Sequence, residues 1–428
     1  MMARDTVTIF SGIPNGTVVI PPSKSIAHRA LICAALCPKG SVSRLSDMPC
    51  NEDIDATLDC LRALGVVIKE QSSQEHTRVL TVEGCGGEWN SLGDVLCCRE
   101  SGSTLRFMLP LCLLSEHSRS LTGSKKLFSR PLDDYEDLLA DRWRKKTPDG
   151  LELSGGARLN GRTFVLSGKS SSQFISGLLF VLPLLEQDST IELPQALESR
   201  SYVDMTIAVL ARFGVQAAWV SDTCLSVKGR QCYSPHDMAV DGDASGAAFF
   251  YALKDLSPSG TALEIVCGQS RDIVQGDAVC AALLDELKAT DMPIISLADC
   301  PDLGPILFAA AAAQKGGIFT HTARLRLKES DRVSAMAQEL AKFGARLEMR
   351  DEEQGGKVIV WPAEGGLCVP QEVLHGHNDH RIVMSLAVLI ACLGTACPVT
   401  IDDAHAVAKS FPDFFDKLCS LGIECRLN

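Results

Sequence analysis

The sequence predicts an α/β protein of two similar domains, each built from three β-α-β-α-β-β units around a helical core. Six segments pass from small or polar residues into an apolar run, and their first residues lie 78, 70, 71, 60 and 76 residues apart. A second helical pattern follows each segment, and short β-rich runs separate the helices. One unit cannot bury both its sheet and its helices, whereas three units closing around shared helices can. The alternative is an ordinary doubly wound α/β protein in which the regular spacing is accidental.

The first helix of each unit is expected where the apolar run begins. The turn before it is rich in Ser, Asp and Asn, which cap helices. The six runs are SKSIAHRALICAAL from Ser23, SGSTLRFMLPLCLL from Ser101, SSQFISGLLFVLPLL from Ser171, GDASGAAFFYAL from Gly242, DLGPILFAAAAA from Asp302 and NDHRIVMSLAVLIA from Asn378.

The second helix ends at a glycine in four of the six units, namely at Gly65, Gly214, Gly344 and Gly422. Glycine is the residue expected just past the last turn of a helix. These helices are expected in NEDIDATLDCLRALG, SRPLDDYEDLLADRW, SRSYVDMTIAVLARFG, SRDIVQGDAVCAALLDELKA, KESDRVSAMAQELAKFG and KSFPDFFDKLCSLG.

Strands are expected before both helices and after the second one. Examples are TVVI, SVSRL and VLTV in the first unit, TFVLSG, STIEL and CLSVKG in the third, and GGIFTH, RLEM and KVIVW in the fifth. The segment before Ser23 supplies a further strand whose partners the pattern does not identify.

The composition excludes several classes of function. The chain has 41 Lys and Arg against 53 Asp and Glu, a net charge of -12, which argues against a partner that is nucleic acid or an anionic membrane. No apolar run reaches the ~20 residues of a membrane helix. No secretion signal is visible at the N-terminus, so we expect a cytoplasmic protein.

The 18 cysteines include no C-x-x-C pair, so zinc ribbons and fingers are not expected. Many lie inside apolar runs, as Cys33, Cys60, Cys112, Cys280 and Cys392 do. We interpret them as buried structural thiols; one reactive thiol or disulfide bonds are the lesser alternatives.

Cations and hydroxyls gather at the helix starts, where the helix dipole and free N–H groups favour anions. Side chains of these types hold phosphates and carboxylates. They are Lys24, Ser25, Arg29, Arg130, Ser171, Ser172, Gln173, Ser199, Arg271, Lys328, Arg332, Arg381 and Lys409.

Each of these segments alone has an ordinary interpretation. SKS and SSSQ can be capped turns, and KESDR can be an exposed helix turn with a local ion pair. HGHNDHR could suggest a metal site, but it lacks a clear carboxylate partner; the favoured interpretation is that Asp379 and His380 orient Arg381 or cap the helix. The set of segments, one in each unit, is what predicts an anion-binding cleft.

Taken together, the segments resemble the EPSP synthase family. SKS…HR, SRPL, SSSQF, GDAS, LKESDR, NDHR and KSFPDF stand in the family's order and span almost the whole chain. The resemblance implies the inside-out α/β barrel fold of the enolpyruvyl transferases. It also implies one domain of residues 22–240 and one built from residues 1–21 and 241–428, with the active-site cleft between them.

The resemblance implies transfer of the enolpyruvyl group of phosphoenolpyruvate to the 5-hydroxyl of shikimate 3-phosphate, with release of phosphate (EC 2.5.1.19). This step belongs to the shikimate pathway, which leads to chorismate and the aromatic amino acids. Both substrates carry phosphate and carboxylate groups, which explains the cations and helix starts. The family implies no metal, no organic cofactor and a monomer.

The resemblance assigns the shikimate 3-phosphate site to residues of several units. Lys24 would contact both substrates and Gln173 would bridge them. The remaining contacts would come from Ser25, Arg29, Ser171, Ser172, Ser199, Tyr202, Asp302 and Lys328.

For phosphoenolpyruvate, where the family also binds the inhibitor glyphosate, the resemblance implies Lys24, Gly102, Arg130, Gln173, Arg332, Arg381 and Lys409. Asp302 is the candidate base for the hydroxyl, and Glu329 is the candidate acid for the methylene carbon. Lys24 and Lys328 would assist, and the sequence leaves open which carboxylate moves which proton.

Two positions depart from the family pattern. Glu100 stands where the family often has Asn, which adds a negative charge near an anion site; Arg99 or Arg106 is its expected partner. Arg324 stands at another position that is often Asn.

Two alternatives share the fold. The sister enolpyruvyl transferase that acts on a UDP-amino sugar should carry a Cys in an active-site loop, and residues 123–130 contain none. A non-catalytic sensor of phosphorylated ligands should lose Lys24, Asp302 or Glu329, and all three are present.

Overall fold

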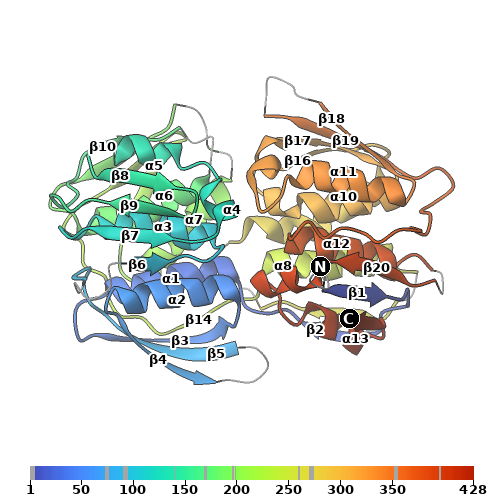
Figure 1. The fold of residues 1–428 in the computed structure, drawn as a ribbon, viewed down its shortest axis with the longest axis horizontal. Helices are drawn as coiled ribbons and strands as arrows, with labels where there is room; N and C mark the ends of the chain where they lie inside the picture. The colour runs from blue at the N-terminus through green and yellow to red at the C-terminus, as the bar shows by residue number, and fades with distance from the viewer. Residues whose placement is uncertain are drawn as a thin grey trace. The chain divides into compact units, whose positions relative to one another are not determined.

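The computed structural model describes residues 5–72, 77–89, 95–139, 141–167, 171–194, 197, 199–258, 261–268, 274–350, 355–394 and 397–428. The chain divides into two compact units. The terminal unit comprises residues 1–21, 242–268 and 276–428, and the inserted unit comprises residues 22–241 and 269–275. Figure 1 shows the elements of each unit.

The inserted unit contains three four-stranded sheets with the same topology. In each sheet the first two strands are parallel and the other two are antiparallel. The first sheet has the order β14-β3-β5-β4. Its elements are β3 (Val42–Pro49), β4 (Val67–Ser72), β5 (Thr77–Glu83) and β14 (Met238–Ala239), with helices α1 (Lys24–Leu36) and α2 (Glu52–Ala63).

The second and third sheets follow the order β6-β7-β9-β8 and β10-β11-β13-β12. The second β-α-β-α-β-β repeat consists of β6 (Val95–Cys97), α3 (Gly102–Cys112), β7 (Arg119–Thr122), α4 (Lys125–Phe128), α5 (Asp133–Leu138), β8 (Trp143–Thr147) and β9 (Gly150–Leu153). The third consists of β10 (Thr163–Val165), α6 (Ser172–Val181), β11 (Ser189–Glu192), α7 (Arg200–Arg212), β12 (Ala217–Ser221) and β13 (Cys224–Val227).

The terminal unit repeats this arrangement less regularly. The fifth of the six β-α-β-α-β-β repeats belongs to the terminal unit and has a four-stranded sheet of order β16-β17-β19-β18. The elements are β16 (Ile294–Ser296), η3 (Pro301–Leu303), α10 (Gly304–Ala313), β17 (Gly317–Thr320), η4 (Ala323–Leu327), α11 (Arg332–Lys342), β18 (Arg346–Arg350) and β19 (Lys357–Trp361). The sixth contains α12 (His380–Ala391), β20 (Val399–Asp402), η5 (Ala404–Lys409), α13 (Phe414–Ser420) and β21 (Cys425–Leu427).

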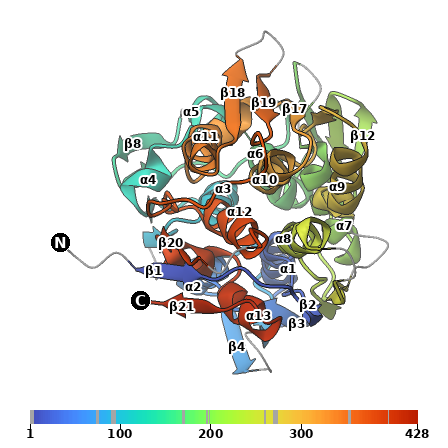
Figure 2. The ribbon, with the colours of Figure 1, turned by 90° about the vertical axis from the view of Figure 1, so that its right-hand side faces the viewer.

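The N-terminal strand completes the sixth sheet. β1 (Thr6–Ile9) pairs antiparallel with β20 on one side and with β21 on the other (Figure 2). Leu374 forms a parallel bridge to Ile401 at the outer edge of β20. The N-terminal strand, whose partners the sequence did not identify, is therefore β1. In the sixth repeat β1 takes the place that a strand of the C-terminal hairpin takes in the other four-stranded sheets.

The fourth β-α-β-α-β-β repeat is shorter than the other five repeats. Its elements are α8 (Ala244–Leu256), β15 (Leu263–Val266), η2 (Gly276–Val279) and α9 (Cys280–Ala289). Among the described residues its sheet has two strands, because β15 pairs only with β2 (Gly16–Val19) and the hairpin after the second helix is missing. The 60-residue spacing from Gly242 to Asp302, the smallest of the five, reflects this difference. The start of its expected second helix, residues 270–273 with Arg271, lies outside the described residues. The prediction that the run TVVI belongs to the first repeat was wrong: most of it forms β2, which pairs with β15, and β14 fills its place in the first sheet.

The first helices of the units form the cores. α10 is buried from Gly304 to Ala312 and packs against α8 and α12, while α3 packs against α6. A helix that is buried on all sides needs no polar face, which explains why α10 contains no charged residue. All 18 cysteines are free thiols; Cys33, Cys60, Cys112 and Cys280 are buried as expected, and Cys392 is partly buried. None of the described helices is long and apolar enough to span a bilayer.

The crossing of α3 and α6 depends on a glycine. An ideal Cβ on Gly177 would lie 2.6 Å from the carbonyl oxygen of Arg106 and would collide with the hydroxyl of Tyr135. The backbone oxygen cannot rotate away as a side chain could. This contact places the start of α6, which carries candidate binding residues, against α3.

We expect Gly177→Ala to lower the free energy of unfolding by about 2 kcal/mol, because overpacking outweighs the helix propensity that alanine gains. Equilibrium urea unfolding of the full chain measures it. Gly268→Ala is the control, since a Cβ there meets nothing within 4 Å. Equal stability of the two variants would contradict the proposed close packing.

Candidate active site

The terminal unit gathers three cations around one carboxylate. Asp302 lies in η3, the turn that leads into α10. Its Oδ1 lies 3.3 Å from Lys328 Nζ and 3.0 Å from Arg332 Nη1. Its Oδ2 accepts a hydrogen bond from Arg381 Nη2 at 3.0 Å, and its carbonyl oxygen accepts one from Arg381 Nη1 at 3.1 Å. Four residues predicted to share a site are thus brought into contact.

Arg332 joins this cluster to two further carboxylates. Its side chain is 1% exposed, and it donates to Glu329 Oε2 at 2.6 Å and to Asp379 Oδ2 at 2.9 Å, in addition to Asp302. Burial lowers the pKa of Arg332, but Asp379, Glu329 and Asp302 outweigh burial and raise it. The guanidinium therefore stays charged inside the protein.

Asp379 caps α12, as predicted. Its Oδ1 accepts the backbone N–H of Arg381 at 3.0 Å, and its Oδ2 accepts the hydroxyl of Ser330 at 2.9 Å. The carboxylate is fully buried. It connects the start of α12 to the turn before α11 and so sets the direction in which Arg381 leaves the helix.

The other histidines of HGHNDHR contact carboxylates. His375 Nδ1 lies 2.7 Å from Asp402 Oδ2, and His377 Nε2 lies 3.4 Å from Glu339 Oε1. Among the described residues, no group of three or more His, Cys, Asp or Glu is placed to hold a metal ion.

Lys409 reaches the turn before α12 from η5. Its Nζ donates to the carbonyl oxygen of Asn378 at 3.0 Å and to its Oδ1 at 2.9 Å. The side chain is nearly buried. Because Asn378 directly precedes Asp379, Lys409 is held next to the cluster around Asp302.

The charges of this cluster set the protonation of its members. Burial raises the pKa of Asp302, but Arg381, Lys328 and Arg332 outweigh it and hold this pKa well below its usual range. Burial lowers the pKa of Lys328, and Asp302 only partly offsets this. An ionised carboxylate thus lies beside an ammonium group that releases its proton more easily than usual, which is an arrangement suited to proton transfer.

In the inserted unit, Lys24 is the first residue of α1. Its Nζ lies 2.9 Å from Asp53 Oδ2, and the two side chains are 16% and 17% exposed. Asp53 stands in the first turn of α2. Sequence reasoning does not single out Asp53, because an acid in the first turn of a helix is common.

Arg29 is a buried cation one turn further along α1. Its donors go to Thr206 Oγ1 at 2.7 Å, to the Tyr202 carbonyl oxygen at 2.9 Å and to the Ser25 carbonyl oxygen at 2.6 Å. In the part of the chain that the structure describes, no carboxylate pairs with it. Burial lowers the pKa of Arg29 to about 10, so it remains charged at neutral pH. This uncompensated charge favours an anion near Ser25 and Tyr202.

Gly102 begins α3 and faces two guanidinium groups. An ideal Cβ there would lie 2.8 Å from Arg106 Nη1 and 2.9 Å from Arg130 Nη1, with Gln173 Oε1 at 3.9 Å. Arg106 Nη1 donates to Gln173 Oε1 at 3.0 Å, and Gln173 Nε2 donates to Ser103 Oγ at 2.8 Å. Three predicted residues, Gly102, Arg130 and Gln173, therefore meet here.

Arg106 belongs to the same group but was not predicted as a site residue. The available signal is its position, since it is the one charged residue of α3 and lies one turn after Gly102. Its guanidinium is largely buried and lies 5.2 Å from the ring centre of Phe174. It fixes the orientation of the Gln173 amide.

The predicted serines lie at the starts of α6 and α7. Ser171 caps α6 by accepting the backbone N–H of Gln173 at 3.3 Å, and Ser172 is buried beside it. Ser199 precedes α7, is 1% exposed and has a φ of 59°, a backbone conformation uncommon for a residue with a side chain. Tyr202 lies in the first turn of α7.

The two units differ in what precedes their first helices. In the inserted unit these residues are Ser23, Ser101 and Ser171, and in the terminal unit they are Asp243, Asp302 and Asp379. A serine leaves the positive helix end uncompensated, so it remains available to an anion. An aspartate adds a negative charge near that end, and Asp302 and Asp379 contact side-chain cations. The inserted unit is thus suited to bind anions directly, and the terminal unit to hold arginines and lysines.

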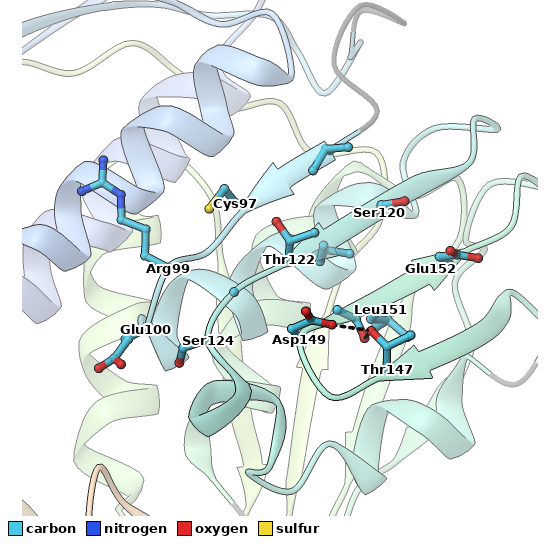
Figure 3. A pocket seen from close by; sticks show the side chains of 14 residues that line it. Cys97, Arg99, Glu100, Ser120, Thr122, Ser124, Thr147, Asp149, Leu151 and Glu152 are labelled. Atoms are coloured by element: carbon cyan, nitrogen blue, oxygen red, sulfur yellow. Dashed lines mark hydrogen bonds between the residues drawn. The ribbon is translucent and has the colours of Figure 1, made fainter.

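A groove of about 640 Å³ lies on the inserted unit along β6, β7 and β9 (Figure 3). Arg99 and Glu100 line one end, Ser120 and Glu152 lie on the other side, and Thr147 donates to Asp149 at 3.1 Å between them. The described ion pair of Arg99 is with Asp59. None of the predicted site residues lines the groove, so it is separate from the candidate site.

Comparison with known proteins gives a consistent result. A family model described as "EPSP synthase (3-phosphoshikimate 1-carboxyvinyltransferase)" matches residues 12–418. The chain is 35% identical to the 3-phosphoshikimate 1-carboxyvinyltransferase of Clostridium kluyveri, over 96% of this chain and 95% of the relative. It is 36% identical to that of Clostridium perfringens, over 95% of this chain and 96% of the relative.

Solved structures confirm the predicted fold class. EPSP synthase from Acinetobacter baumannii superposes with a TM-score of 0.77 at 22% identity, covering 99% of this chain and 100% of the other. The enolpyruvyl transferase NikO from Streptomyces tendae gives a TM-score of 0.73 at 15% identity and covers 99% of each chain.

We expect Asp379→Asn to lower the free energy of unfolding by about 3 kcal/mol, because the buried Arg332 loses a charged partner. Chemical unfolding measures this loss. Asp331→Asn is the matched control: Asp331 caps α11 at the surface, and asparagine caps equally well. If the control were destabilised as much as Asp379→Asn, the loss would follow from removing any charge at a helix start, and the argument from the buried Arg332 would be wrong.

Proposed function

Because this chain belongs to the EPSP synthase family, we propose that the clusters described above hold the two substrates of its reaction. The enzyme transfers the enolpyruvyl group of phosphoenolpyruvate to shikimate 3-phosphate and releases phosphate (EC 2.5.1.19), a step of aromatic amino-acid biosynthesis. The observation that carries the proposal is the contact of Asp302 with Lys328, Arg332 and Arg381.

We assign shikimate 3-phosphate mainly to the inserted unit, the predicted domain 22–240. Hydroxyls at uncompensated helix starts suit a phosphate group, and these come from Ser171, Ser172 and Ser199. The charge of Arg29 lacks a carboxylate partner among the described residues and suits an anionic ring substituent near Ser25. Tyr202 would lie beside the ring.

We assign phosphoenolpyruvate to cations and one amide donor from both predicted domains. Arg130 and Gln173 beside Gly102 form one set, and Arg332, Arg381 and Lys409 form the other. Lys24 would contact both substrates. A ligand with two anionic groups needs cations at both ends, which explains why neither set is sufficient alone.

The reaction requires two proton transfers at the first step. Asp302 would accept the proton of the 5-hydroxyl as the hydroxyl oxygen attacks C2 of phosphoenolpyruvate. Glu329, once it has taken up a proton from solvent, would donate that proton to the methylene carbon C3. Lys328 would hold the same hydroxyl. In the tetrahedral adduct that results, the C2–O bond to phosphate then breaks and C3 returns its proton to the carboxylate of Glu329, which restores the double bond. Asp302 passes the proton of the former hydroxyl to the leaving phosphate.

The cations around Asp302 make its basicity depend on whether phosphoenolpyruvate is bound. With three cations around it, Asp302 is a weak base, because they hold its pKa low. When the anionic groups of phosphoenolpyruvate bind Arg332 and Arg381, those side chains stabilise the carboxylate less, and its basicity rises. Substrate binding would thereby activate the base.

We propose that the protein works as a monomer in the cytoplasm, and that the chemistry uses side chains alone. Lys24, Asp302 and Glu329 are all present, which favours an enzyme over a sensor. The test is release of inorganic phosphate from phosphoenolpyruvate in the presence of shikimate 3-phosphate. No release with both substrates present would overturn the assignment of the reaction to this protein.

Replacing Lys24 by Met keeps the aliphatic stem and removes the charge. Charge-assisted hydrogen bonds contribute roughly 1.5–3 kcal/mol each, so contacts to two anions predict a fall in kcat/KM of at least about 100-fold. Phosphate release measures it. Lys39→Met, at an exposed position of the same unit, should keep wild-type kinetics. Unchanged kinetics in folded Lys24→Met would refute the role of Lys24.

Gly102→Ala should affect glyphosate more than phosphoenolpyruvate. The new methyl group would displace the flexible ends of Arg106 and Arg130 and shorten the pocket, and glyphosate is the longer ligand. We expect the glyphosate inhibition constant divided by the KM for phosphoenolpyruvate to rise at least about tenfold, or ~1.4 kcal/mol of discrimination. An unchanged ratio would mean that Gly102 does not face this ligand; Gly268→Ala serves as control.

A further inference from the structure

The turn before α12 contains two consecutive residues in the left-handed backbone region. His377 has a φ of 54° and Asn378 a φ of 48°, and no other adjacent pair of non-glycine residues in the described part of the chain shares this conformation. Such residues are uncommon, and they persist where their surroundings fix the backbone. The turn matters for the candidate site because Asn378 accepts two hydrogen bonds from Lys409 Nζ.

Carboxylates from other segments hold the first part of this turn. Glu339 Oε2 accepts the backbone N–H of His375 at 2.9 Å, and Asp402 Oδ1 accepts that of Gly376 at 2.8 Å. Glu339 is fully buried in α11, and Asp402 is the last residue of β20. The conformation of the turn is therefore set by side chains that are distant in the sequence.

Asp403 holds the second part of the turn. Its Oδ2 accepts the backbone N–H of Asn378 at 2.9 Å. An aspartate before a helix commonly caps it, but Asp403 has a φ of 54° and its side chain caps none of the described N–H groups of η5. The carboxylate serves the turn instead. Asn378 is thus held from both ends of η5, by Asp403 just before its start and by Lys409 at its last residue.

The residue after Asn378 is held by different partners. Asp379 Oδ2 accepts hydrogen bonds from Arg332 and Ser330, and its Oδ1 caps α12. A change in the carboxylate of Asp403 should therefore leave the start of α12 in place. Its effect should reach the site through the lysine that Asn378 holds.

We propose that Asp403 is a positioning residue for phosphoenolpyruvate binding, which keeps Asn378 in the conformation that presents two oxygen atoms to Lys409. The ammonium group of Lys409 is nearly buried on a flexible stem, so its direction depends on the acceptors that hold it. Fixing these acceptors places the charge before the substrate arrives. The inference rests on the proposed function, since it concerns the assigned contact of Lys409 with phosphoenolpyruvate. Asp403 itself needs no contact with the substrate.

The test compares the kinetics of wild type, Asp403→Gly and Asp403→Asn. Both new residues tolerate a positive φ, but only asparagine keeps an oxygen that can accept the N–H of Asn378. For Asp403→Gly we expect the KM for phosphoenolpyruvate to rise about tenfold, because a charge-assisted contact is weakened. The kcat and the KM for shikimate 3-phosphate should stay within about threefold, since only uniform binding of one substrate is lost. Asp403→Asn should restore most of the affinity for phosphoenolpyruvate.

A double-mutant cycle measures whether Asp403 acts through Lys409. Lys409→Met removes the ammonium group, so adding Asp403→Gly to it should change the KM for phosphoenolpyruvate by less than about twofold. His405→Gln is the matched control, because His405 lies in η5 but is 58% exposed and lies 3.7 Å from Asp5, away from the turn. Its kinetics should equal those of wild type.

Several results would overturn the inference. They are an unchanged KM for phosphoenolpyruvate in Asp403→Gly, equal rises for both substrates, no rescue by Asp403→Asn, or a full effect in the Lys409→Met background. If Asp403→Gly does not fold, Asn378→Gly decides: it keeps the positive φ and the carbonyl acceptor but loses Oδ1, so an unchanged KM for phosphoenolpyruvate would refute the role of the turn. Failure of the proposed function is distinct, because wild type itself would then release no phosphate from the two substrates.

Discussion

The buried charge of Arg332 is the interaction on which the terminal unit's site depends. The guanidinium is 1% exposed and contacts carboxylates from η3, from the turn before its own helix and from the start of α12. A buried guanidinium cannot be left unpaired without a large free-energy cost, so these three segments must meet at this point. Once they meet, Lys328 and Arg381 lie against Asp302. Folding of this unit and assembly of its cation cluster are therefore one event.

The starts of the first helices carry different residue types in the two units of the chain. Serine caps in the inserted unit leave the helix ends to an external anion, and aspartates in the terminal unit neutralise theirs and hold cations instead. The repeated unit thus provides the geometry, and a single residue type at each start decides which partner is held. This division explains how an acidic protein with a net charge of -12 can present sites for two anionic substrates.

The sequence predicted the helices well because α10 and α12 are buried on all sides and their apolar runs are uninterrupted. It predicted the capping role of Asp379, since an aspartate before an apolar run has few other uses. It missed the short fourth sheet, although the 60-residue spacing signalled it, and it missed the partners of β1. Contacts such as Arg332 with Asp379, 47 residues apart, arise only from packing and leave no local pattern. The substrate roles of the site residues remain predictions.

The position of β1 sets an order for folding during synthesis. Its partners β20 and β21 are the last two strands of the chain, so the sixth sheet cannot close until the ribosome has made residue 427. Residues 22–241 contain three complete four-stranded sheets and can fold long before that. In a nascent chain the inserted unit can therefore be folded while β1 is still unpaired, because β20 and β21 have not yet been synthesised. Chaperones that bind exposed strands would meet this protein at its N-terminal end.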